Sequence, residues 1–360
     1  MPSAPVTPAS PTPKKLVIVT GSGRSGTSTV AGTLKKLGLH VPQPEVRADA
    51  SNPRGFFESR WALRFHKRVL AEAGVRTLDA RPEAWDLVAA VVGRPDLQQE
   101  LTDWLARKTK GSQILVKDPR AFWLRDLWVR AADDHRLHTE FLTMLRHPAE
   151  VVSSRDMHYL QSAQADVRTI RETANVAGWV NVALINERVS RDSARAFARY
   201  EDLITDWRST MRSVGTRLDL TFNGDLGTDE HHPVDDFIDA KLRRANASWD
   251  GLHVHAQLRD IAETVWQALN VLVDRPCDPA AMATLDSMRA EYDTLHRYSA
   301  ALVQDHTNSA IKAAREQTRI RVTREVERRF ARAEEARKYQ AGLSSLPRRV
   351  VRKARALRQT

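Results

Sequence analysis

The chain has 360 residues, 42% of them hydrophobic, which is enough for one large domain or two small ones with a substantial core. A single cysteine, Cys277, excludes an intramolecular disulfide, and no C-x-x-C pair indicates a zinc site. We therefore expect a reducing, cytoplasmic setting. The sequence contains no run of about 18 apolar residues, so no membrane span is predicted.

The net charge of +11 is concentrated in one part of the chain. Residues 311–360 contain 16 Lys and Arg against 5 Asp and Glu, whereas the preceding residues contain 40 of each kind. The high isoelectric point is therefore no argument for nucleic-acid binding by the body of the protein. Only the tail is a candidate basic surface.

The predicted elements alternate between strands and helices along the chain. Residues 1–13 contain five prolines and no charge, which predicts a disordered leader rather than a signal peptide. Apolar and β-branched runs predict strands over 16–19, 113–117, 139–145 and 194–200. Helix-length segments are 27–37, 61–73, 95–108, 122–132, 149–160 and 167–189, and the region from 233 to 305 is mostly helical.

This alternation predicts an α/β fold with a central parallel sheet covered on both faces. We expect residues 14–305 to form one domain. Residues 306–360 follow as a basic helical tail, broken near 342–347, where glycine and proline occur.

The first predicted strand runs into a loop suited to an anion. Gly21–Gly26 fits the start of the nucleotide-binding pattern G-x-x-x-x-G-K-[ST], but Thr27 replaces its lysine. Glycines and helix N-terminal amides still favour an oxyanion, and Arg24 adds a fixed positive charge. The missing lysine argues against a kinase or ATPase. An ordinary glycine turn is the other reading of this segment.

The segment GRSGTST resembles the 5′-phosphosulfate loop of sulfotransferases that use 3′-phosphoadenosine 5′-phosphosulfate (PAPS). This resemblance implies a three-layer P-loop NTPase-like fold and a donor-binding loop formed by Gly23, Arg24, Ser25, Gly26, Thr27 and Ser28. In FLTMLRHPAEVVSSRDMHYL, Arg146 ends a strand and Ser154 follows eight residues later, as in the family's 3′-phosphate motif. RYEDL resembles the segment whose tyrosine lies near the adenine, which implies the same place for Tyr200.

Two further segments, NPRGFFE (52–58) and KDPR (117–120), resemble those of bacterial sulfotransferases. Lys117 or Arg120 could stabilise the transferring sulfonate, although an internal pair between Asp118 and Arg120 is an equally open reading. Arg243 and Arg244 offer a further basic contact to the 3′-phosphate, but KLRRA departs from the R-K-G form of the cytosolic animal enzymes.

Sulfonate transfer to an alcohol requires a base for the hydroxyl proton and positive groups for the leaving phosphate. Glu58 is the first candidate base, because flanking phenylalanines would remove water from it; a helix N-terminal residue favoured by the dipole is the alternative. His66 lies about two helical turns further on a similar face and is the second candidate. Glu45 is the third. Arg24 supplies the cation in the loop, so the motifs require no metal.

Tryptophans at helical spacing have two readings. Trp61, Trp123 and Trp128 could line an acceptor pocket, but such aromatic residues usually belong to the core. The acceptor itself is not named by the sequence. We expect a hydroxyl of a carbohydrate, a glycolipid or a small natural product, with PAPS as co-substrate.

The sequence of the tail indicates a candidate contact surface of its own. In PRRVVRKARALRQT (347–360), apolar residues share one helical face among six basic residues, which indicates peripheral contact with the inner face of a membrane. A solvated tail is the other reading. Two rival functions stay open: a P-loop kinase with a displaced lysine, and a non-catalytic protein that binds membrane or nucleic acid through its basic tail.

Overall fold

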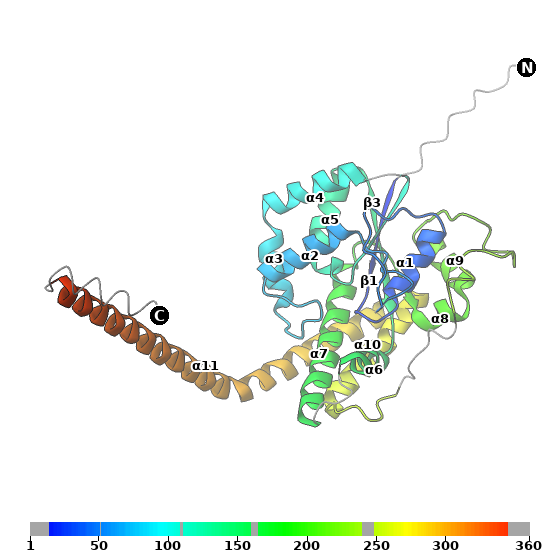
Figure 1. Ribbon diagram of the computed structural model, residues 1–360. Helices are drawn as coiled ribbons and strands as arrows, with labels where there is room; N and C mark the ends of the chain where they lie inside the picture. The colour runs from blue at the N-terminus through cyan, green and yellow to red at the C-terminus, as the bar shows by residue number, and fades with distance from the viewer. Residues whose placement is uncertain (1–13, 51, 109–110, 160–164, 240–247, 345–360) are drawn as a thin grey trace, which may run out of the picture. The chain divides into compact units, whose positions relative to one another are not determined.

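The computed structural model of the protein describes residues 14–50, 52–108, 111–159, 165–239 and 248–344 (Figure 1). The predicted leader, Arg243, Arg244 and the segment 345–360 lie outside the described residues. The chain divides into two compact units, residues 1–296 and residues 297–360. The predicted domain boundary at residue 305 remains a prediction.

A parallel sheet of four strands forms the centre of the first unit. Its strands are β1 (Lys15–Thr20), β2 (Gln113–Lys117), β3 (His138–Leu145) and β4 (Ala194–Arg199), in the order β2-β1-β3-β4. Val17 of β1 pairs with Leu115 on one side and Glu140 on the other. Every residue of β1 is buried, as expected for a strand covered on both faces. The predicted parallel sheet is confirmed.

Helices cover the sheet on both faces (Figure 1). Because side chains alternate along a strand, Val17 and Val19 face the layer of α1, α8 and α9, while Leu16 and Ile18 face the layer of α2 to α5. The helices of these two layers are α1 (Thr27–Lys36), α8 (Tyr200–Thr205), α9 (Trp207–Arg217), α2 (Arg60–Glu72), α3 (Ala84–Val92), α4 (Pro95–Lys108), the 3-10 helix η1 (Ala121–Leu124) and α5 (Arg125–Asp133). The predicted three-layer α/β fold is confirmed.

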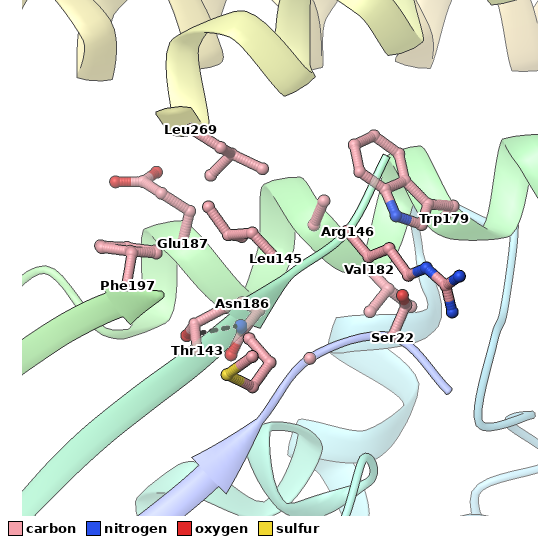
Figure 2. Close-up of a pocket in the computed structure, with 13 residues that line it drawn as sticks. Ser22, Thr143, Leu145, Arg146, Trp179, Val182, Asn186, Glu187, Phe197 and Leu269 are labelled. Atoms are coloured by element: carbon pink, nitrogen blue, oxygen red, sulfur yellow. Dashed lines mark hydrogen bonds between the residues drawn. The ribbon is translucent and has the colours of Figure 1, made fainter. Parts of the chain in front are cut away.

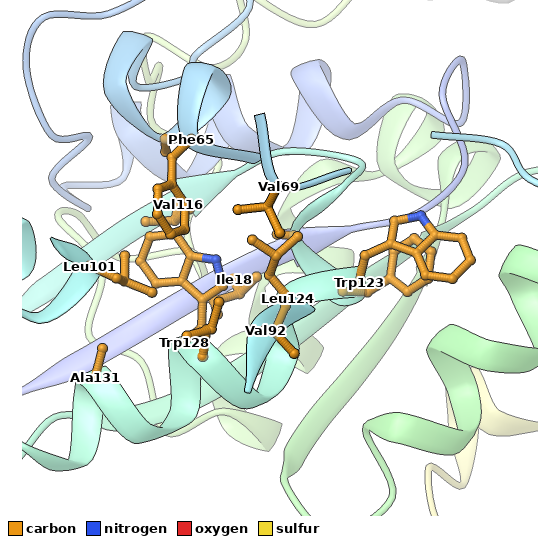
Figure 3. Packing of buried hydrophobic residues seen from close by; sticks show 14 of the residues in the cluster. Ile18, Phe65, Val69, Val92, Leu101, Val116, Trp123, Leu124, Trp128 and Ala131 are labelled. Carbon is orange, nitrogen blue, oxygen red and sulfur yellow. The ribbon is translucent and has the colours of Figure 1, made fainter. Parts of the chain in front are cut away.

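The layer of α2 to α5 contains a core rich in tryptophan (Figure 3). Trp123 and Trp128 are buried there beside sheet residues such as Ile18. Trp61 packs against the same core and stacks on Trp104 with ring centroids 4.5 Å apart. The core reading of these tryptophans is therefore correct, and they do not line the cavity described below.

A third group of helices packs beside β3 and β4. It consists of α6 (Pro148–Tyr159), α7 (Ala165–Val189), α10 (Ala256–Asp274) and the first turns of α11 (Pro279–Ser344). Tyr292 of α11 is buried, and its hydroxyl donates to the carbonyl of Ala80 at 2.5 Å. The first turns of α11 thus belong to the first unit.

The second unit contains the rest of α11, described as far as Ser344. Its apolar side chains are exposed, among them Leu302 and Phe330, which are 84% and 72% accessible. Of the predicted break at 342–347, residues 342–344 are still helical and residues 345–347 fall outside the described residues. Within the described part of the chain, no helix combines the length and the apolar character that crossing a membrane requires.

Candidate active site

The loop after β1 is a backbone cradle at the carboxyl edge of the sheet. Gly21, Arg24 and Gly26 have positive φ angles of 134°, 77° and 91°, so the chain turns sharply here. Gly26 is the N-cap of α1, whose first residue is Thr27. The unpaired amides of the first helical turn therefore lie at the loop, as an anion site requires.

One cavity of about 320 Å³ gathers most of the predicted site residues. Its predicted members are Gly23, Arg24, Gly26, Thr27, Ser28, Glu58, Lys117, Arg146, Ser154 and Tyr200. All of them except Glu58 lie at or after the carboxyl ends of the four strands, where ligands bind in open parallel sheets. Thr29, Asn52, Pro53, Arg54, Phe56 and Pro119 complete the lining. Sequence reasoning gave these last residues no role, although most lie in the two segments noted as bacterial.

The charge of this cavity favours an anion. Among the described residues, four cationic side chains line it, Arg24, Arg54, Lys117 and Arg146, against one carboxylate, that of Glu58. Arg54, in the turn before Glu58, donates to the carbonyl of Phe237, which ties this turn to a distant segment of the chain. A concave site with a surplus of cations concentrates anionic ligands.

The two predicted phosphate motifs meet in the structure. Arg24 donates from Nε to Oγ of Ser154 at 3.2 Å, although 130 positions separate the two residues in sequence. Ser154 lies about two turns into α6, as expected. The loop and the strand–helix motif thus form one site rather than two.

Arg146 is held firmly where β3 meets α6. Its Nε donates to Oε2 of Glu150 at 2.8 Å, and its Nη1 donates to the carbonyl of Arg24 at 3.1 Å. The guanidinium lies over the ring of Tyr200, with Cζ 4.9 Å from the ring centroid. Arg146 is 8% exposed, and Nη2 has no hydrogen-bond partner among the described residues. Glu150 is a contributor that the sequence motif did not reveal.

A small cavity of about 20 Å³ lies behind the loop (Figure 2). Ser22 and Arg146 both line it, and Oγ of Ser22 is buried with no hydrogen-bond partner among the described residues. Asn186 donates to Oγ1 of Thr143 at 3.1 Å on the same wall. Ser25, predicted to bind the donor, is buried with its Oγ likewise unpartnered in the described chain, and it does not line the larger cavity.

Glu58 is paired with a lysine from β2. Nζ of Lys117 lies 2.6 Å from Oε1 of Glu58 and 3.1 Å from Oγ of Ser28. Glu58 is 6% exposed and precedes Ser59, the N-cap of α2, so it is outside the helix. The alternative reading of Glu58 as a helical first-turn residue is therefore wrong. Lys117 also places a lysine ammonium group near the start of α1. The loop itself has Thr27 at the position where the nucleotide-binding pattern has its lysine.

His66 is buried in the core, where both its ring nitrogens are bonded to other side chains. It is 0% exposed; its Nδ1 lies 2.9 Å from Oδ2 of Asp118, and Nε1 of Trp128 donates to its Nε2 at 2.9 Å. An indole nitrogen only donates, so Nε2 must accept and Nδ1 carries the proton of a neutral imidazole. No lone pair is left for a substrate proton, and His66 does not line the cavity. These contacts argue against His66 as the base.

Asp118 is the centre of this buried network. It also accepts from the backbone N and the Nε of Arg120, at 2.9 and 2.7 Å. Burial alone would raise the pKa of Asp118, but the hydrogen bond from His66 and the charge and hydrogen bonds of Arg120 outweigh it and hold the pKa below its ordinary 3.8. The predicted internal pair of Asp118 and Arg120 is thus present. Glu45, the third candidate base, bonds to Lys35 and Gln43 instead and does not line the cavity.

Comparison with known proteins identifies the family. A sequence model of the sulfotransferase family matches residues 17–224, more than half of the chain. The protein therefore belongs to the sulfotransferase family, as the resemblance of its motifs predicted. Among curated proteins, no significant match was found.

Solved structures of low similarity were also found. The sulfotransferase domain from the Synechococcus PCC 7002 olefin synthase is 15% identical, with a TM-score of 0.42, over 73% of this chain and 97% of that chain. The sulfotransferase domain from the Curacin biosynthetic pathway is 14% identical, with a TM-score of 0.34, over 67% of this chain and 81% of that chain.

In the described residues, no group of three or more His, Cys, Asp and Glu side chains could hold a metal ion.

Proposed function

We propose that the protein transfers a sulfonate group from PAPS to a hydroxyl group of an acceptor. The observation that carries this proposal is the contact between Arg24 and Ser154, at 3.2 Å. It joins an anion-binding loop to a second anion-binding motif in one cavity. Such a cavity suits a ligand with two separate anionic groups, here a 5′-phosphosulfate and a 3′-phosphate.

The residues present fit such a donor. The loop residues Gly23 to Ser28 would hold the phosphosulfate, with Arg24 as the cation, and Arg146 with Ser154 would hold the 3′-phosphate. Arg146 is buried and has an unpartnered Nη2 within the described structure, which an anionic ligand could satisfy. When bound, PAPS supplies a sulfonate activated by its phosphate leaving group.

Glu58 is the proposed general base. Its Oε1 is held by Lys117, while no other described residue bonds Oε2. Oε2 is therefore available to take the proton of an acceptor hydroxyl that enters the cavity, a role worth about 10² to 10⁴ in rate. Lys117 keeps the carboxylate in position and places positive charge beside Ser28, where negative charge on a transferring sulfonate would be stabilised.

The acceptor is proposed only as a class. Beside Glu58 the cavity presents Asn52, Pro53, Phe56 and Pro119, which combine one amide with apolar surface. This lining suits a hydroxylated molecule with apolar parts, such as a small natural product, a carbohydrate or a glycolipid. A screen of these classes with labelled PAPS, and with Glu58→Gln as the inactive control, would name the acceptor.

Calorimetric titration tests the donor site. Wild type and Arg146→Ala would be titrated with adenosine 3′,5′-bisphosphate and with ATP–Mg²⁺. We expect tight binding of the bisphosphate by the wild type, weak binding of ATP and a loss in the variant. Preference for ATP–Mg²⁺ would favour the kinase with a displaced lysine, a reading that Lys117 near Ser28 keeps chemically reasonable.

We also propose a cytoplasmic protein whose tail, residues 306–360, contacts an anionic membrane surface. Support comes from the excess of basic residues in the tail and the exposed apolar side chains of α11, such as Val322 and Phe330. Deletion of residues 306–360 should abolish binding to liposomes that contain anionic lipid. Unchanged binding would refute this part of the proposal.

A further inference from the structure

Tyr200 lies between the two anion-binding motifs. Its ring edge meets the loop so closely that a Cβ on Gly26 would lie 2.2 Å from Cδ2 of the tyrosine. Its ring centroid is 4.9 Å from Cζ of Arg146. Tyr200 is only 7% exposed. An aromatic platform for a base needs an open face, and the guanidinium of Arg146 already lies over this ring.

The guanidinium of Arg146 is constrained on three sides. Glu150 accepts from Nε at 2.8 Å, the carbonyl of Arg24 accepts from Nη1 at 3.1 Å, and the ring of Tyr200 contacts the guanidinium itself. The two hydrogen bonds fix directions within the guanidinium plane. The ring closes one side of the guanidinium, so that Arg146 cannot move in that direction. The side chain therefore has little rotamer freedom left to lose when a ligand binds.

We propose that Tyr200 is a positioning residue for Arg146 and that it acts on recognition of the donor's 3′-phosphate rather than of its adenine. This inference rests on the proposed function, because the phosphate belongs to PAPS. The family resemblance, by contrast, implies that the tyrosine of RYEDL lies near the adenine. Gly26 belongs to the same arrangement, since any side chain there would displace the ring.

Glu150 also orients Arg146, so its contribution has to be separated from that of the Tyr200 ring. Its carboxylate orients Arg146 and also places a negative charge beside the phosphate site. Removal of Glu150 would change orientation and charge together, so its effect on affinity has no single cause. Tyr200 has a neutral side chain, and its replacement alters the support of Arg146 without changing the charge of the site. Variants of Tyr200 are therefore the more informative test.

The experiment compares two ligands that differ only in the 3′-phosphate. Wild type, Tyr200→Leu and Tyr200→Phe would be titrated calorimetrically with adenosine 3′,5′-bisphosphate and with adenosine 5′-monophosphate. We expect Tyr200→Leu to weaken the bisphosphate about tenfold, the scale of a buried cation–π contact, and to leave the monophosphate unchanged. Tyr200→Phe keeps the ring and should bind both ligands like the wild type.

Equal weakening of both ligands by Tyr200→Leu would overturn the inference, because loss of adenine stacking affects both alike. So would an equal loss in Tyr200→Phe, which would assign the effect to the hydroxyl. If Tyr200→Leu does not fold, as judged by circular dichroism, Tyr200→Met fills a similar volume without an aromatic face and provides the same comparison.

A double variant adds a second readout. If Tyr200 acts through Arg146, then Tyr200→Leu should weaken the bisphosphate no further once Arg146→Ala is present. Independent, additive losses would contradict the inference. Failure of the wild type to bind the bisphosphate would overturn the proposed function and this inference with it. Retained wild-type binding with equal loss of both ligands in Tyr200→Leu would overturn the inference alone.

Discussion

Nζ of Lys117 lies 2.6 Å from Oε1 of Glu58, and both side chains are almost completely buried. This ion pair connects the carboxyl end of β2 to the turn before α2, and it lies on the wall of the cavity. Each charge compensates for the hydration that the other has lost. The proposed base is therefore also part of what holds the site together.

Removal of the lysine should cost stability. In Lys117→Met the carboxylate of Glu58 stays buried without its cation, and we expect the free energy of unfolding to fall by about 3 kcal/mol. Urea denaturation of the purified variant would measure this. The double variant Lys117→Met/Glu58→Gln contains neither charge and should recover most of the loss while remaining inactive. Lys117→Met with wild-type stability would show that the pair contributes nothing to the fold.

The choice between Glu58 and His66 as base can be tested directly. Glu58→Gln keeps an acceptor for Lys117 but cannot take a proton, and turnover should fall by about 10² to 10⁴. His66→Gln can still donate to Asp118 and accept from Trp128, so turnover should change little. Both variants would be assayed with labelled PAPS after calorimetry has verified that they bind adenosine 3′,5′-bisphosphate. The opposite ranking of the two variants would restore His66 as the base.

Much of the fold was predictable because its signals are local. The apolar runs of β1 and β3 lie within one or two residues of their predicted ends, since buried parallel strands are continuously apolar. The glycine loop and Arg146 were also found from their immediate neighbours in sequence. Their meeting at one edge of the sheet followed from the rule that ligands bind at the carboxyl ends of parallel strands.

The contacts of the candidate bases were not predictable, because they depend on packing between distant segments. The spacing argument placed Glu58 and His66 on one helical face, but α2 begins at Arg60, so helical periodicity does not relate them. His66 instead turns into the core, where Asp118 and Trp128 bond both its nitrogens. No local pattern indicates that Lys117, 59 positions from Glu58, is its partner.

Asp118 should make stability depend on pH at the acid end. Its folded-state pKa lies below the ordinary 3.8, so the stabilisation it provides is complete above about pH 4. That stabilisation is lost as the pH falls through the lowered pKa, because the carboxylate is then protonated in the folded state as well. Asp118→Asn should therefore be less stable than the wild type at pH 7, with a difference that shrinks as the pH falls below about 4.

Unfolding free energies in urea, measured at several pH values, would test this expectation. The exposed Asp260 offers a matched control, because Asp260→Asn removes a carboxylate that forms no hydrogen bond or ion pair with a described side chain. The control should track the wild type at every pH. A difference between Asp118→Asn and the wild type that stays constant down to pH 2 would mean that the network of Asp118 stabilises the fold through packing alone.

The last prediction concerns two glycines of the same loop. Gly26 has a φ of 91°, and a Cβ there would lie 2.2 Å from Cδ2 of Tyr200. Gly26→Ala should therefore lose about 1 to 2 kcal/mol to the left-handed backbone alone, and more to displacement of the ring. Gly23 lines the same cavity, but a Cβ there meets no atom within 4 Å.

Gly23→Ala is thus a control with the same chemical change in the same loop. Thermal unfolding should show a lower Tm for Gly26→Ala and a nearly unchanged Tm for Gly23→Ala. Equal losses would mean that the flexibility of the loop, rather than the contact with Tyr200, requires glycine. A loss in Gly26→Ala that exceeds the roughly 1 to 2 kcal/mol of the left-handed backbone, beside an unchanged Gly23→Ala, would show that the ring of Tyr200 leaves no room for a side chain in the loop on which the positioning of Arg146 depends.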